Sequence, residues 1–104
     1  MILATTDSIA GRAIVEYKGF VRGSSVRGHD LPSDLASRMH GLVGGEIPAY
    51  TQLLAQVREE ALDRMVAEAK ALGADAIVGL RYASTEIATG AAEMLCYGTA
   101  VKLA

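Results

Sequence analysis

The sequence predicts an α+β fold in which a largely antiparallel sheet packs against one short and one long helix. Apolar residues recur at steps of three and four over residues 48–72, which is the spacing of one helix face. Segments rich in β-branched residues lie before and after that stretch, and glycines separate them from it. The chain has 104 residues, and this length fits a single domain spanning residues 1–104.

Two strands are expected near the N-terminus, over residues 2–5 and 12–27. The first is a short apolar run, and a turn containing Asp7 and Gly11 follows it. The second segment alternates and is rich in residues that favour strands. We expect these two strands to form a hairpin. We also expect Gly19 to mark a bulge or a close approach of another backbone.

A short helix is expected over residues 32–42. Asp30 or Ser33 can cap its first turn, and Pro32 restrains that turn. Residues 44–45, both glycine, end this helix and form a hinge into the next one. The apolar stripe of the short helix consists of Leu35, Met39, Leu42 and Val43.

A long helix is expected over residues 48–72. Pro48 suits a first helical position, and Gly73 can adopt the left-handed conformation that ends a helix. Such a helix is about 37 Å long at a rise of about 1.5 Å per residue. This length predicts that the helix spans a whole sheet or reaches a neighbouring subunit. Its apolar stripe consists of Tyr50, Leu53, Leu54, Val57, Ala61, Met65, Ala69 and Leu72.

Two further strands are expected over residues 76–87 and 92–103. Asp75 precedes the first of them and is either a ligand carboxylate or, as we favour, a turn residue that bonds to nearby backbone. Both faces of the last strand carry apolar residues, which predicts that it is covered on two sides. One face carries Leu95, Tyr97, Thr99, Val101 and Leu103, and the other carries Met94, Cys96, Gly98, Ala100 and Lys102.

Composition argues against several classes of protein. Ten basic and twelve acidic residues give a net charge of −2, whereas a dedicated nucleic-acid-binding protein needs a basic face. The single cysteine, Cys96, allows no intrachain disulfide and no multi-cysteine zinc site within one chain. We find no signal-peptide pattern and no apolar run long enough to span a membrane, so we expect a cytoplasmic protein.

The candidate metal ligands are Cys96 and Met94, whose sulfurs share one face of a strand. Soft metal ions prefer such ligands, so a two-sulfur site for a soft or borderline metal ion is one hypothesis. The alternative is that both side chains are core or interface residues, because free cysteine is among the most buried residue types. His29 and His40 are further candidates, which we interpret as structural histidines.

The candidate anion ligands are Arg22 and Arg27, within a serine-containing segment that repeats the tripeptide Val-Arg-Gly. This segment lacks the spacing of a phosphate-binding loop, so the alternative is a strand with solvent-facing arginines. No acid, base and nucleophile occur at catalytic spacing, and we therefore rank an enzyme behind a binding or a structural protein.

Several separated blocks of the sequence match one known family. These blocks are Ile14-Val15-Glu16-Tyr17 with the preceding Thr5-Thr6 and Gly11, Val43-Gly44-Gly45 with Ala49-Tyr50, Leu72-Gly73-Ala74-Asp75-Ala76-Ile77-Val78-Gly79, and Gly98-Thr99-Ala100-Val101. On these residues the chain resembles the YbjQ-like family, whose members are labelled heavy-metal-binding, over nearly its full length. The resemblance implies an α+β fold and a ring-shaped homopentamer. It implies no established activity and no catalytic residue.

Two functional hypotheses follow from the sequence and the resemblance. The first is a ring that binds a small ligand or a heavy-metal ion, through Cys96 and Met94 or through Arg22 and Arg27. The second is a structural or interaction protein without small-molecule chemistry, whose ring presents a repeated surface to a protein partner. Ring assembly would also cover exposed strand edges.

Overall fold

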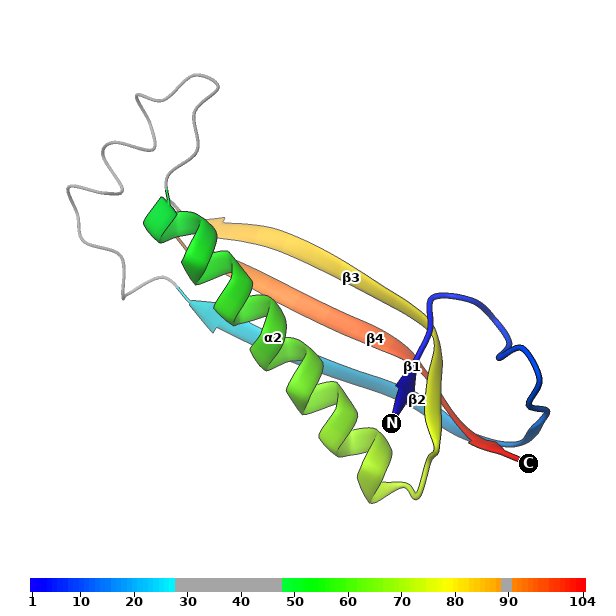
Figure 1. Cartoon of the computed structure of the whole chain (residues 1–104). Coiled ribbons are helices and arrows are strands. Elements are labelled where there is room, and N and C mark those ends of the chain that lie inside the picture. Colours follow the sequence, from blue (N-terminus) through cyan, green and yellow to red (C-terminus); the bar gives the residue numbers. More distant parts are fainter. Residues whose placement is uncertain (28–47, 89–90) are drawn as a thin grey trace.

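The computed structural model describes residues 1–27, 48–88 and 91–104. The short helix expected over residues 32–42 and both histidines lie outside these residues. The described chain is an α+β structure in which one long helix lies across one face of a sheet (Figure 1). Its elements are β1 (Ile2–Leu3), β2 (Ile14–Arg27), α2 (Pro48–Ala71), β3 (Ala76–Ala88) and β4 (Ala91–Leu103).

The sheet is mixed, with the strand order β1-β3-β4-β2. Strand β4 pairs antiparallel with β2 on one side and with β3 on the other, while β1 pairs parallel with β3. The predicted hairpin of the first two strands is therefore wrong. β2 forms its long ladder with β4, and the chain after β1 instead extends along β3, where Leu80 N–H donates to the carbonyl of Ala4 over 3.0 Å.

Two glycines allow the strands to bend. The register of β2 against β4 shifts between Tyr17 and Gly19, and Gly19 has a φ of +123°. The predicted bulge is thus confirmed. A second shift lies between Val78 and Arg81 of β3, where Gly79 has a φ of +62°. Since only glycine adopts such angles without a steric cost, these positions fix where the sheet bends.

Helix α2 ends one residue before the predicted boundary, at a glycine-based cap. Gly73 has a φ of +78°, and its N–H donates to the carbonyl of Lys70 over 3.0 Å. The N–H of Ala74 donates to the carbonyl of Ala69 over 3.1 Å. These two bonds satisfy carbonyls that the helix end would leave without partners, and they turn the chain directly into β3.

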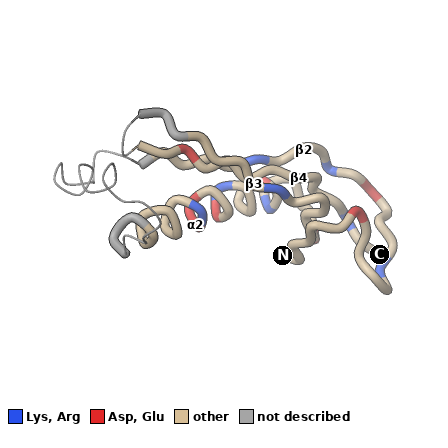
Figure 2. The backbone as a smooth tube through the Cα atoms, turned by 90° about the horizontal axis from the view of Figure 1, so that it is seen from above, with Lys and Arg blue, Asp and Glu red and all other residues tan. Residues whose placement is uncertain are grey.

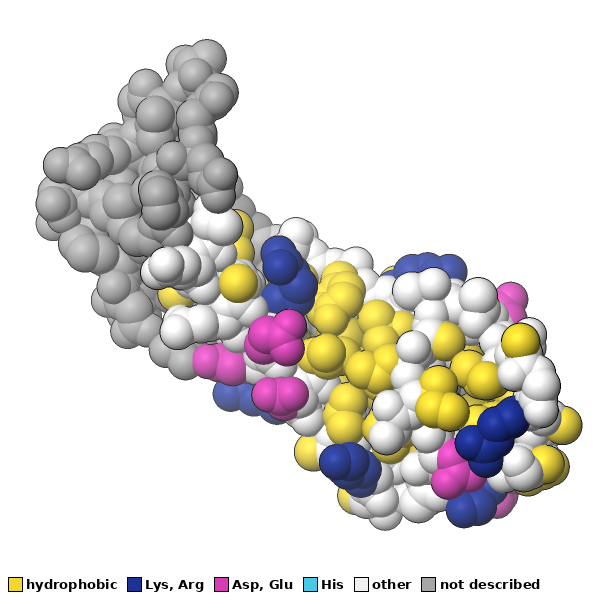
Figure 3. Space-filling model, viewed as in Figure 1, with side chains coloured by type: hydrophobic (Ala, Val, Ile, Leu, Met, Phe, Trp, Pro, Cys, Tyr) yellow, Lys and Arg dark blue, Asp and Glu magenta, His cyan; other side chains and the backbone are white. Residues whose placement is uncertain are grey.

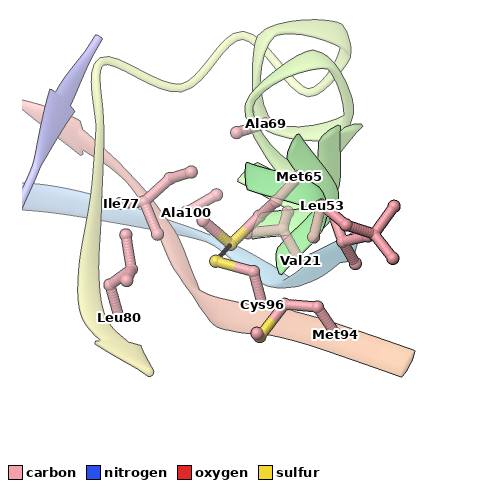
Figure 4. Packing of buried hydrophobic residues seen from close by; sticks show 11 residues of the cluster. Val21, Leu53, Met65, Ala69, Ile77, Leu80, Met94, Cys96 and Ala100 are labelled. Atoms are coloured by element: carbon pink, nitrogen blue, oxygen red, sulfur yellow. Dashed lines mark hydrogen bonds between the residues drawn. The ribbon is translucent and has the colours of Figure 1, made fainter. Parts of the chain in front are cut away.

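The main core lies between α2 and the sheet. Small residues let the two layers approach closely: a Cβ on Gly23 of β2 would overlap the carbonyl oxygen of Ala61 and would lie 2.5 Å from the backbone nitrogen of Met65. Buried hydrophobic residues of α2 and all three long strands fill this layer (Figure 4). They are Val21, Leu53, Val57, Ala61, Met65, Ala69, Ile77, Leu80, Met94, Cys96 and Ala100.

A smaller core lies on the opposite face, at the end of the sheet where the chain begins. Val78 and Val101 are buried there, and Ile9 and Ile14 pack against them. The prediction that the last strand is covered on both faces is therefore correct for this part of β4. Elsewhere, Figure 2 shows α2 on one side of the sheet and no described element on the other. We call this uncovered side the open face.

Helix α2 also leaves part of its own side of the sheet uncovered. It packs mainly on β2 and β4, and the side chain of Tyr82 on β3 is 41% exposed. Figure 3 shows hydrophobic side chains gathered beside α2, over the middle of β3 and β4. Apolar surface is therefore accessible on both faces of the described sheet.

Candidate functional site

The predicted metal ligands lie in the main core, beside a second methionine. The Sγ atom of Cys96 donates a hydrogen bond to the Sδ atom of Met65 over 3.6 Å (Figure 4). Met94 lies two residues before Cys96 on the same face of β4 and belongs to the same buried cluster. Cys96 and Met65 are fully buried, and Met94 is 7% exposed. Met65 was not among the candidate metal ligands in the sequence analysis, because only the packing of α2 on β4 brings its sulfur close to Cys96.

The environment of Cys96 favours the protonated thiol. Burial raises the pKa of the Cys96 thiol, and a hydrogen bond with the Tyr82 hydroxyl lowers it in part. Burial, followed by the neighbouring Cys96 and Glu59, raises the pKa of Tyr82. Because the thiolate is the form that ligates a metal, an ion binding here must first displace the thiol proton.

The side chains of this cluster fit some metal ions and not others. Within residues 1–27, 48–88 and 91–104, no group of at least three His, Cys, Asp or Glu side chains could hold an ion. The described residues therefore do not form the four-ligand site that structural zinc requires. One thiol and two thioethers are instead the ligand types that suit a soft monovalent ion such as Cu(I) or Ag(I).

The predicted anion ligands lie on β2, at different positions of its ladder. Arg22 is exposed on the open face, and its guanidinium carbon lies 5.9 Å from the ring centroid of Phe20. Arg27 is the last residue of β2 and is paired with Ala92 of β4. The two arginines are five positions apart on β2, and the register pairs them with different residues of β4, Tyr97 and Ala92.

The register of the sheet instead places two other residues in one row with Arg22. Neither of them was a candidate ligand in the sequence analysis. Tyr97 of β4 is directly opposite Arg22 on one side and directly opposite Arg81 of β3 on the other. Arg22, Tyr97 and Arg81 thus form one row across three strands on the open face. Strand alternation could have indicated the face of each residue, but the row depends on pairing register, which no local pattern contains.

Asp75 bonds to backbone, as favoured from the sequence, but to a distant part of it. Its Oδ2 atom accepts a hydrogen bond from the Leu103 N–H over 2.9 Å, and Lys102 Nζ lies 3.5 Å from Oδ1. The bond from Leu103, together with the charges of Lys102 and Arg12, holds the pKa of Asp75 below its usual range. Asp75 thus joins the turn after α2 to the end of β4.

In the described part of the chain, these features define an α+β protein with one long helix on a mixed sheet, a buried sulfur cluster and a sheet face that no described element covers (Figure 2). Residues 1–104 match the model of a family described as "Putative heavy-metal-binding", YbjQ_1. The chain belongs to this family. No helix within the described part of the chain is both long and apolar enough to cross a membrane.

Relatives of similar length carry names without an activity. A "UPF0145 protein" from Clostridium perfringens is 50% identical over 101 residues, covering 97% of this chain and 95% of the relative. A protein of the same name from Fervidobacterium nodosum is 52% identical over 103 residues, covering 99% and 95%. A crystal structure of a protein of unknown function from Pediococcus pentosaceus, assigned to the DUF74 family, matches with a TM-score of 0.70 at 22% identity. It covers 100% of this chain and 98% of the other, and it supports the fold.

Proposed function

We propose that the protein works as a ring-shaped homo-oligomer in which β2 of one copy pairs with β3 of the next. The observation that carries this proposal is the pair of long strand edges. In the described sheet, β2 has a strand neighbour on one side alone, β4. β1 pairs with β3 at Ala76 and Ile77, and no strand among the described residues pairs with the outer edge of β3 from Tyr82 onward. Bare edges expose backbone donors and acceptors that another strand can satisfy.

The two edges differ from each other, which determines the kind of assembly they support. Both β2 and β3 run antiparallel to β4, so they run parallel to each other. A contact between two different surfaces is repeated from copy to copy and closes into a ring when the rotation permits. The family resemblance gives five as the expected number of copies. The proposal keeps the cytoplasmic location expected from the sequence.

The shape and surface of one copy support assembly. The described residues have a radius of gyration of 16.9 Å, whereas a compact chain of about 100 residues has about 13 Å. Val15, Tyr17 and Phe20 of β2 are each at least 60% exposed. Large hydrophobic side chains exposed close together are typical of a surface that another chain covers.

Native mass spectrometry with amide hydrogen exchange tests the ring. We expect a single closed assembly, a pentamer, in which alternate amides of β2 and of residues 82–88 are protected from exchange. The amides of β4 are the internal control, since they are bonded within one copy whether or not copies associate. A monomer at micromolar concentration, or free exchange along both edges of an oligomer, would refute this assembly.

A second candidate function is favoured by the sulfur cluster: binding of a soft monovalent metal ion by Cys96, Met65 and Met94. Two sulfur ligands with metal–sulfur distances of about 2.3 Å can be 3.6 Å apart at one ion. The protein would store or deliver the ion, and the ion would take part in no reaction. The chain would hold it away from water within the core.

Titration with Ag(I) tests the metal candidate in the assembled protein. We expect one equivalent per chain, lost in Cys96→Ala and weakened in Met65→Leu and Met94→Leu. Val57→Ala is the control, because it loosens the same core without removing a sulfur. Equal silver uptake by Cys96→Ala would eliminate this site. The ring would then stand as a scaffold that presents a repeated surface to a protein partner.

A further inference from the structure

The open face carries its side chains in cross-strand rows that the register defines. Arg22, Tyr97 and Arg81 form one row. Phe20 is paired with Thr99 in the adjacent row. Neighbouring strands are about 4.8 Å apart, so the backbones of the two arginines are separated by about 10 Å, with the tyrosine midway between them.

The aromatic residues of these rows form a platform. The rings of Phe20 and Tyr97 have centroids 6.4 Å apart and an interplanar angle of 43°. Phe20 is 60% exposed although it is a large apolar side chain. The Arg22 guanidinium lies at cation–π distance from the Phe20 ring. An aromatic surface next to a guanidinium suits a planar, aromatic ligand that also carries negative charge.

The second arginine is held in place by the backbone. Nη1 of Arg81 donates to the carbonyl of Thr5 over 2.9 Å and to that of Leu80 over 2.8 Å. Both bonds involve one nitrogen of a group that has five N–H donors. These bonds restrict the rotamers of Arg81, and its residue surface remains exposed. A pre-oriented guanidinium loses less conformational entropy when it binds an oxyanion.

We propose that the row of Arg22, Tyr97 and Arg81 binds a nucleoside polyphosphate, with the base on the Phe20–Tyr97 platform and the phosphates between the two guanidinium groups. Arginine binds phosphate through paired N–H donors, and a polyphosphate chain can extend across a separation of about 10 Å. A nucleic-acid strand is disfavoured, because its backbone needs a longer track of cations and Glu93 lies on the same face.

This proposal rests on the proposed ring in one respect. Pairing through strand edges leaves the open face free, whereas packing two sheets face to face would bury it. Each copy in the ring contributes one row, so we expect one site per chain. The proposal concerns the open face alone and is independent of the sulfur cluster on the other side of the sheet.

Calorimetric titration of the full chain with ATP tests the proposal. We expect saturable binding, weakened about 10–100-fold in Arg22→Ala and in Arg81→Ala, since hydrogen bonds to charged groups have that magnitude. Arg58→Ala is the matched control. It removes the same charge from an exposed position on α2, away from the row, and we expect unchanged affinity.

A comparison of ATP with inorganic tripolyphosphate tests the base-binding and the phosphate-binding parts of the site separately. We expect Tyr97→Leu to weaken ATP binding and to leave binding of inorganic tripolyphosphate unchanged. We expect Arg22→Ala to weaken the binding of both ATP and tripolyphosphate. This variant leaves the bonds of Arg81 to the Thr5 and Leu80 carbonyls in place. Absence of ATP binding up to about 5 mM, or equal loss in Arg58→Ala and Arg22→Ala, would overturn the proposal. Native mass spectrometry of the same samples distinguishes failure of the site, which leaves a ring without ATP binding, from failure of the ring, which leaves a monomer.

Discussion

Gly23 determines how closely α2 approaches the sheet. It lies on β2 directly under the backbone of the helix, between Ala61 and Met65. The residues around it are small or flexible, and the helix backbone itself fills the space that a side chain would take. Backbone atoms cannot move aside as the end of a side chain can, so a substitution here must displace the whole helix.

We expect Gly23→Ala to lower the free energy of unfolding by about 3 kcal/mol or more, at the upper end of the range for overpacking. Gly11→Ala is the control. Gly11 has a φ of +79° with no atom within 4 Å of an added Cβ. That variant should cost about 1–2 kcal/mol through backbone strain alone. Urea denaturation of both variants provides the comparison, and a smaller effect at Gly23 would contradict the close contact.

The Cys96 thiol should be unreactive in the folded protein. It is fully buried and its pKa is raised by that burial, so little of it is thiolate near neutral pH. We expect Ellman's reagent to modify native protein only at the rate of unfolding. Urea-unfolded protein, in which the same thiol is accessible, should react at once. Stoichiometric, rapid labelling of the native protein would show that the thiol is accessible.

Asp75 should make stability depend on acidic pH. Its pKa is lowered in the folded state from the ordinary value of 3.8. The stability it provides is therefore fully present above that ordinary value and is lost as the pH falls through the lowered folded value. We expect the urea midpoint of wild-type protein to exceed that of Asp75→Asn at neutral pH and to converge with it in acid. Asp63→Asn, which removes the same charge from an exposed site on α2, is the control.

At the scale of elements, α2 is fixed to the sheet by one buried stripe and by polar bonds to β2. Ser25 Oγ donates to Glu60 Oε2 over 2.6 Å, and the Arg64 guanidinium donates to the Ser24 carbonyl. Beside these bonds runs the stripe of Val57, Ala61, Met65 and Ala69, each at most 1% exposed. The stripe is the larger source of stability, because it removes apolar surface from water along the whole helix.

Met65→Ala should destabilise the protein by about 2–5 kcal/mol, the usual range for a large core residue replaced by alanine. Met65 is fully buried against Cys96. Val66→Ala, one residue further along, changes a half-buried position and should cost less than about 1 kcal/mol. Thermal or urea unfolding of both variants measures the contrast. Equal effects would mean that the helix packs on a different face.

Local patterns predicted the elements well and their partners poorly. The periodicity over residues 48–72 and the signal at Gly73 predicted α2 to within one residue, because both are properties of consecutive residues. The predicted partner of β1 was wrong, because the two residues Ile2–Leu3 contain no information about which distant strand they pair with. Met65 beside Cys96 and Arg81 beside Tyr97 were missed for the same reason: both contacts depend on packing or register between segments far apart in the chain.

At the scale of the whole molecule, the described part of one copy is a thin slab. Its principal extents are 52 × 25 × 17 Å, and the shortest corresponds to one helix layer on one sheet layer. A slab of this kind has no second sheet or helix layer over most of its open face among the described residues (Figure 2). In the proposed ring, contacts between copies would therefore supply much of the stability.

We expect the melting temperature to rise with protein concentration, because association stabilises only the folded state. Calorimetric scans over about a hundred-fold range of concentration should separate by several degrees, since a change of about 1 kcal/mol moves the midpoint by about 4–8 °C in domains of this size. Superimposable scans, with a pentamer mass at none of the concentrations, would indicate a stable monomer.

The common direction of β2 and β3 has a consequence for anything that meets the ring. Both chain termini lie at one end of the slab, whereas β2 ends and α2 begins at the other (Figure 1). A ring formed through these parallel edges repeats that orientation in every copy, so it is a polar object with two chemically different rims. A partner, a fused domain or a second ring would then meet either the rim of termini or the rim where α2 begins, and the two encounters would not be equivalent.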